Sequence, residues 1–173
     1  MRRKTVILGF LLALSMILSY IESLLPLTVG IPGMKLGLPN LVVVLLLYSY
    51  GGKEAFAVNL LRIVLSGFLF GNLSAILYAL SGAVCSFVMM LLLRKTGRFS
   101  IAGISIGGGV FHNIGQTAAA CLVVEASAPL FYLPFLLAAG AVTGFLIGFT
   151  AVRVQPGISR LLENGEGRVD ERL

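Results

Sequence analysis

Long apolar runs follow one another along the whole chain, and short polar stretches separate them. Of the 173 residues, 58% are hydrophobic and only 12% are charged. A soluble domain covers its surface with more charge, since about 25% of its residues are charged on average. A helix that crosses a bilayer needs about 20 mostly apolar residues. The sequence therefore predicts an all-α membrane protein.

Six apolar runs predict a bundle of six transmembrane helices. Their approximate bounds are 5–24, 38–50, 55–70, 73–93, 101–124 and 130–152. Residues 1–152 would form one transmembrane domain, and residues 153–173 a polar, partly disordered tail. The run at 38–50 is short for a crossing. The loop 25–37, which is rich in Pro and Gly, is therefore expected to dip into the membrane where protein covers it.

Basic residues predict the orientation. With a cytoplasmic N-terminus, 11 of the 13 Lys and Arg residues fall in inner segments: Arg2, Arg3, Lys4, Lys53, Arg94, Lys95, Arg98, Arg153, Arg160, Arg168 and Arg172. Short inner loops of membrane proteins are enriched in Lys and Arg. Both termini are thus expected in the cytoplasm, which requires an even number of crossings. Basic clusters between apolar runs indicate membrane orientation, and no nucleic-acid partner is expected.

Two charged residues, Glu22 and Arg62, fall within predicted spans. Arg62 lies near the middle of the third span, with Asn59 one turn before it. A charge at that depth costs about 2.5–3.5 kcal/mol and faces a partner or a cavity. Arg62 would contact an anionic or polar ligand, or pair with Glu22 or with helix-end carbonyls. Glu22 shares a helical face with Ser15 and Ser19, and either lines a cavity mouth or reaches the interface.

The fifth span carries His112, Asn113 and Gln116 near its middle. Hydrogen-bonding groups at this depth need partners, so these residues either line a binding cavity or hold helices together. His112 is the single histidine, which excludes a haem held by two histidines of this chain. One histidine and scattered carboxylates do not make a zinc site, and no metal or covalent cofactor is expected.

Small residues recur four apart in two spans. Gly9 and Ala13 lie in the first span, and Gly140, Gly144 and Gly148 in the sixth. Such patterns let helices approach closely, either inside the bundle or against a partner.

Enzyme chemistry has little support in the sequence. The one aspartate is Asp170, in the tail, and the glutamates are dispersed. Reactions of diphosphates through Mg²⁺ need clustered carboxylates. The glycines 107–109 lack the Lys-Ser/Thr of a phosphate-binding loop. The chain is expected not to be an enzyme, and any transport energy must come from another protein or an ion gradient.

Several stretches resemble the bacterial Gx transporter family, whose members are often labelled heptaprenyl diphosphate synthase component I. They are Pro32–Asn40, Gly51–Ala55, Leu61–Ile63, Gly107–Gly109 and His112–Gln116, within a resemblance that covers about residues 5–152. That family is similar to the S components of energy-coupling factor (ECF) transporters. The resemblance implies an ECF S-component-like six-helix bundle in the bacterial cytoplasmic membrane.

The resemblance also implies partners and site residues. S components capture a small molecule from outside and pass it inward with a coupling subunit and two ATPases. Gly9 and Ala13 match the small-residue face that docks the coupling subunit. Lys35 and Asn40 lie in the stretch that resembles the entry to the second helix, and they join the candidate ligand contacts.

The main hypothesis is a transport subunit that binds a vitamin, a flavin, or a quinone or prenyl precursor, with loop 25–37 as a lid. The candidate substrate-binding residues are Glu22, Lys35, Asn40, Asn59, Arg62, His112, Asn113 and Gln116. One alternative is a membrane partner of an extracytoplasmic redox protein in quinone- or flavin-linked electron transfer. Another is an accessory subunit of heptaprenyl diphosphate synthesis.

Overall fold

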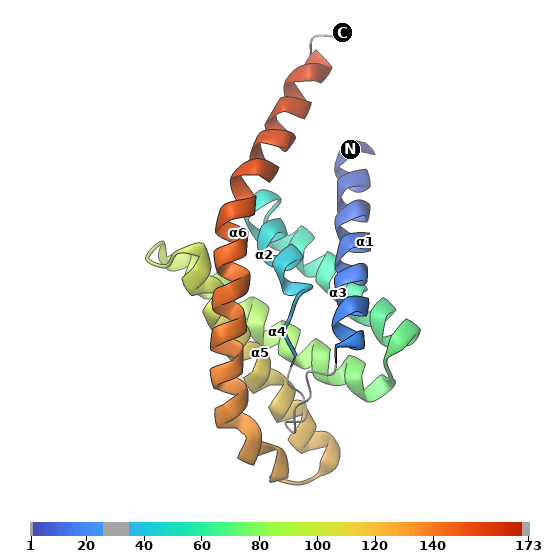
Figure 1. Cartoon of the computed structure of the whole chain (residues 1–173), viewed down its shortest axis with the longest axis vertical. Helices are drawn as coiled ribbons and strands as arrows, with labels where there is room; N and C mark the ends of the chain where they lie inside the picture. Colours follow the sequence, from blue (N-terminus) through green and yellow to red (C-terminus); the bar gives the residue numbers. More distant parts are fainter. Residues whose placement is uncertain (1, 26–34, 171–173) are drawn as a thin grey trace.

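The structure, a computed structural model, describes residues 2–25 and 35–170. Within these ranges the chain is helical and contains no strand (Figure 1). The elements are α1 (Arg2–Leu24), α2 (Asn40–Ser49), α3 (Gly52–Phe70), α4 (Leu73–Thr96), α5 (Ile101–Val124), the short 3-10 helix η1 (Ala128–Tyr132) and α6 (Leu133–Asp170). The all-α prediction is confirmed. Most of loop 25–37 lies outside the described residues, so its dip and its role as a lid stay predictions.

Local sequence signals set the ends of α4 and α5. The Asn72 side chain accepts a hydrogen bond of 2.8 Å from the Ala75 amide and caps the start of α4. The Ser100 hydroxyl accepts one of 3.2 Å from the Gly103 amide at the start of α5. Gly97 ends α4 in the left-handed region, at φ 66°, where glycine carries no steric cost. Both helices therefore begin at the predicted residues.

The last helix runs further than predicted. The sequence placed the end of the sixth span near residue 152 and a polar tail from Arg153, but α6 is helical to Asp170. Pro156 lies inside it, although proline removes one helical hydrogen bond. The residues after Pro156 include Arg160, Leu161 and Leu162, which favour the helix. The polar residues from Arg153 onward end the apolar run, but they do not end the helix.

α2 is the central helix of the molecule. Its residues 42–47 are each at most 4% exposed, because α3 and α6 pack against it and α1 touches it. A helix that is apolar all round belongs inside a bundle. α5 lies between α4 and α6, and α1 packs mainly on α3. α1 and α6 run along the long axis, and both termini lie at the same end (Figure 1).

The outer surface is apolar. Phe10, Phe68, Leu122 and Phe131 are each at least 70% exposed. Among the described residues, three helical stretches are long and apolar enough to cross a membrane: Arg3–Leu24, Leu73–Thr96 and Ala128–Arg160. This is the make-up of a membrane protein. α2, α3 and α5 are not among these three stretches, so six crossings stay a prediction.

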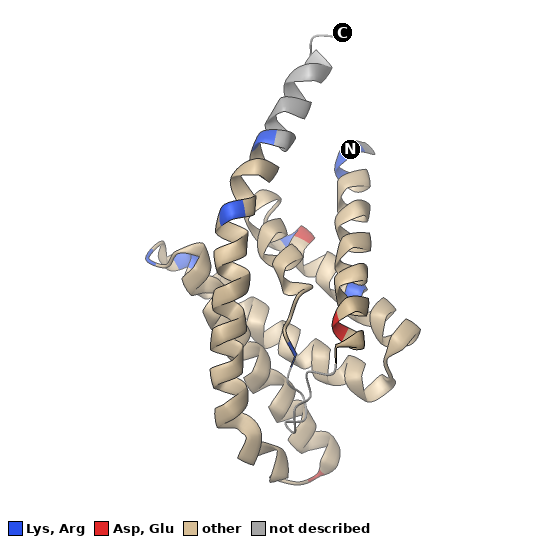
Figure 2. Ribbon diagram, viewed as in Figure 1, with Lys and Arg blue, Asp and Glu red and all other residues tan. Residues whose placement is uncertain are grey.

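Polar contacts connect the start of α1 to the start of α3, and the end of α4 to the end of α2. Lys4, at the start of α1, forms an ion pair with Glu54, at the start of α3, and this hydrogen bond lowers the pKa of Glu54. Arg94 Nη1, near the end of α4, donates to the Leu47 carbonyl of α2 at 2.6 Å. Successive helices α1 to α4 therefore alternate in direction. Basic residues lie at the start of α1 and on the part of α6 that is nearer the C-terminus (Figure 2).

The small residues of α6 serve packing within the chain. A Cβ atom added at Gly144 would lie 2.6 Å from the Ser105 carbonyl oxygen, and one at Gly148 would lie 2.6 Å from the Ala102 Cα. Only glycine permits so close an approach of α6 to α5. Gly9 of α1 differs, since an added Cβ would meet nothing within 4 Å. Gly9 and Ala13 are exposed, and their role in docking a partner stays a prediction.

Candidate binding site

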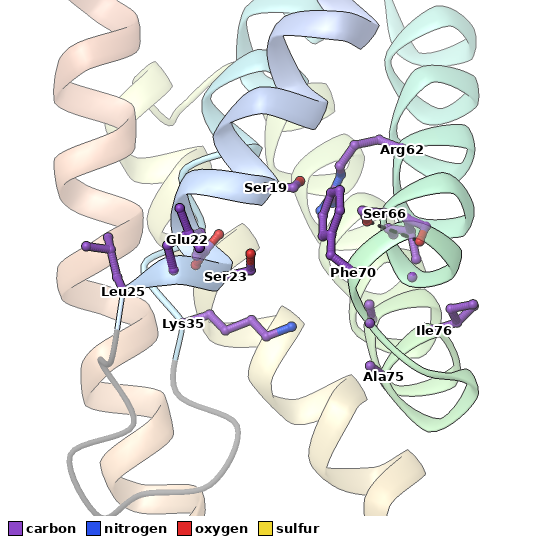
Figure 3. Close-up of a pocket in the computed structure, with 15 residues that line it drawn as sticks. Ser19, Glu22, Ser23, Leu25, Lys35, Arg62, Ser66, Phe70, Ala75 and Ile76 are labelled. Carbon is purple, nitrogen blue, oxygen red and sulfur yellow. Dashed lines mark hydrogen bonds between the residues drawn. The ribbon is translucent and has the colours of Figure 1, made fainter.

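A cavity of about 450 Å³ lies between α1, α3, α4 and the segment that leads into α2 (Figure 3). Its size falls within the range of small-molecule pockets, about 300–1,000 Å³. The lining residues are Ser19, Glu22, Ser23, Leu24, Leu25, Lys35, Arg62, Ile63, Ser66, Gly67, Phe70, Gly71, Ala75, Ile76 and Ala79. It is therefore large enough for a small organic molecule.

Glu22 connects α1 to the start of α2. Its Oε1 accepts a hydrogen bond of 2.6 Å from the Gly37 amide. Gly37 has φ +71°, and its carbonyl accepts from the Asn40 amide at 2.8 Å, which begins the first turn of α2. The Glu22 carboxylate thus fixes the segment that leads into α2 beside the cavity. This contact was not foreseen in the sequence, where Glu22 was interpreted as a mouth residue or an interfacial carboxylate.

Arg62 reaches the cavity from α3. Its Nη2 donates to Asn59 Oδ1 at 2.6 Å, and its buried Nε has no hydrogen-bond partner. In the described part of the chain, Arg62 forms no ion pair with Glu22 within 4 Å. Of the predicted alternatives, the structure does not show a close ion pair with Glu22, and contact with a ligand or with helix-end carbonyls stays a prediction. A buried guanidinium nitrogen without a partner is costly, and a bound acceptor would relieve that cost.

The charge of the cavity is positive overall. Lys35 extends toward the space between α1 and α4, and Arg62 lies on the other side of Phe70 in the same view (Figure 3). Glu22 is the one carboxylate among the lining residues, against these two cations, and it already accepts from Gly37. The arrangement attracts an anion, and a guanidinium is well suited to bind a planar carboxylate.

A second, much smaller cavity lies in the middle of the bundle. Its volume of about 30 Å³ has room for about one water molecule and not for an organic ligand. The polar side chains around it are Asn40, Asn59, Ser86, Ser105, His112 and Thr143. The structure thus separates the predicted site residues into two groups, which the bond between Asn59 and Arg62 connects.

The polar residues of α5 have different surroundings. His112 lies against α4, where a Cβ added at Gly82 would be 2.9 Å from its ring. Asn113 donates through Nδ2 to the Leu136 carbonyl of α6, which favours the interpretation that it holds helices together. Gln116 is half-buried and, among the described lining residues, belongs to neither cavity. Direct contact of these three residues with a ligand stays a prediction.

Some lining residues were missed from the sequence. Ser66 and Phe70 follow Arg62 at helical spacing, so the face of α3 that holds Asn59 and Arg62 could have predicted them. Ile76 and the alanines of α4 carry no such signal, because an apolar residue in a span looks the same whether it faces a cavity, lipid or another helix.

The fold and the cavity define a helical membrane protein with a positively charged binding cavity between its helices. A family model described as heptaprenyl diphosphate synthase component I matches residues 11–154. The chain belongs to this family. A search of curated proteins and a search of solved structures found no match.

Proposed function

We propose that this protein is the ligand-binding membrane subunit of an importer, similar to an ECF S component, and that it holds a small organic molecule in the cavity between α1, α3 and α4. One observation carries the proposal: a cavity of about 450 Å³ contains the buried, partly unpartnered guanidinium of Arg62. An intramembrane ionisable residue beside a cavity is by default a functional group.

Two further features support import with partners. α1 to α4 alternate in direction, as a multi-pass protein with six crossings requires. The outer face of α1 leaves Gly9 and Ala13 uncovered, where a coupling subunit with its ATPases would dock. The chain has one aspartate and would supply no chemistry of its own.

The family description favours one second candidate, an accessory subunit of heptaprenyl diphosphate synthesis. In that role the same cavity would hold a prenyl precursor for a separate catalytic subunit. A strict requirement of a soluble synthase for this chain would support it.

The proposal is tested by ligand-induced thermal stabilisation of the purified protein with vitamins, flavins, and quinone and prenyl precursors. At least one compound is expected to stabilise the wild type, and Arg62→Ala should weaken its binding about 10- to 100-fold, because a hydrogen bond to a charged group contributes about 1.5–3 kcal/mol. Arg98→Ala is the matched control, since it removes an exposed charge outside the cavity. Equal stabilisation of the wild type and Arg62→Ala would contradict the assignment of the cavity.

A further inference from the structure

The two sides of the large cavity differ in chemistry. One side is polar and includes Ser19, Glu22 and Ser23 of α1, together with Lys35. The opposite side comes from α4 and is formed by Ala75, Ile76 and Ala79, without a polar side chain among the described residues. α3 contributes residues of both kinds, with Arg62 and Ser66 polar and Phe70 apolar. A molecule that fills the whole space needs a polar end and an apolar body.

We propose that the ligand is a monocarboxylate with a compact apolar body, whose carboxylate pairs with Arg62 and whose body lies against Phe70 and the α4 residues Ala75 and Ile76. This inference rests on the proposed function and specifies the ligand class of the same cavity.

The charge balance selects the head group. Glu22, Lys35 and Arg62 are the charged residues of the described lining, and together they leave one net positive charge. A carboxylate neutralises this charge. A diphosphate brings more negative charge than the two cations can offset while Glu22 stays bonded to Gly37. Unpaired charge in a site of low dielectric is strongly unfavourable.

The volume limits the apolar body. A water molecule occupies about 30 Å³ in the liquid, so a cavity of about 450 Å³ holds about 15 groups of that size. One or two rings or a short branched chain fit. A chain of seven prenyl units, the product that the family description names, would extend well beyond this volume.

The test uses the whole protein in lipid nanodiscs and measures direct binding of phenylacetate and naphthylacetate. The matched probes are the two corresponding amides, which keep the body and lose the charge; acetate, which keeps the charge and loses the body; and geranyl diphosphate. The two aryl acetates should bind about 10- to 100-fold more tightly than their amides and than acetate, and Arg62→Gln should remove this preference.

Equal affinity for the aryl acetates and their amides, or tighter binding of geranyl diphosphate, would overturn the inference and leave the proposed function standing. Binding that is the same in the wild type and Arg62→Gln would also overturn it. If no probe binds, and no compound in the wider panel stabilises the protein, the inference and the proposed function both fail.

Discussion

The hydrogen bond between Asn59 and Arg62 fixes the position of one end of the Arg62 guanidinium. Asn59 is 4% exposed, and its amide oxygen accepts from one end of the guanidinium. Arg62 also lines the large cavity, and its buried Nε has no hydrogen-bond partner. Asn59 is therefore a positioning residue, which holds Arg62 without itself lining the large cavity among the described residues.

Asn59→Ala should destabilise the protein by about 1–3 kcal/mol, because it leaves a buried guanidinium donor without its acceptor. For a chain of this length the melting temperature should fall by about 2–12 °C. Thermal unfolding in detergent measures it, with Ser74→Ala, an exposed polar residue of α4, as the control. A melting temperature equal to that of the control would show that the bond between Asn59 and Arg62 contributes nothing.

The charged residues of the large cavity could be predicted from the sequence, but the apolar residues of α4 that line it could not. Lys35 was identified through the family resemblance. Arg62 and Glu22 were identified because a charge within an apolar run needs a partner or a cavity. His112 has the same kind of signal, yet it faces the small cavity. A polar residue within an apolar run needs a hydrogen-bonding partner. Whether that partner is a ligand, water or another helix depends on how α4 and α5 pack.

α5 and α6 pack so closely that their backbones are in direct contact, with no side chain between them at the glycines of α6. The glycines of α6 meet the backbone of α5 at Ser105 and Ala102. The sequence pattern predicted close approach but left open whether the neighbour is inside or outside the chain. The starts of α4 and α5 were predictable from their caps, whereas the end of α6 was not, because no single residue forces a polar helix to stop.

Gly144→Ala should lower the melting temperature by about 2–12 °C, because the new Cβ meets the α5 backbone and overpacking costs about 1–3 kcal/mol. Gly9→Ala is the matched control in an open helical position. It should leave the stability unchanged or raise it by up to about 1 kcal/mol, since alanine favours the helix over glycine. Equal effects of the two substitutions would mean that α5 and α6 are not packed as described.

At the scale of the whole molecule, alternating helices enclose a central α2 and place the termini at one end (Figure 1). Termini at one end are consistent with an even number of crossings, and the cytoplasmic orientation stays a prediction. The sequence could predict the bundle because hydrophobic runs and charge placement act along the chain. It could not predict the cavity, because α1, α3 and α4 form it together from residues far apart in the sequence.

The predicted six crossings would place the connection between α4 and α5 on the inner face and the end of α5 on the outer face. In a chain without Cys85 and Cys121, Glu125→Cys should react with a membrane-impermeant thiol reagent on intact cells. Arg98→Cys should react only after the membrane is opened. Both positions are exposed, so access to the reagent depends on the side of the membrane. Labelling of both positions in intact cells would contradict the topology.

The central claim is that the Arg62 cavity holds a small organic molecule. Native mass spectrometry of the gently purified protein, wild type beside Arg62→Ala, tests it most directly. We expect a bound organic acid of about 15 or fewer non-hydrogen atoms on the wild type, together with coupling and ATPase subunits, and loss of the small molecule from Arg62→Ala. The same small molecule on both forms, or a redox partner without any ATPase, would contradict the account.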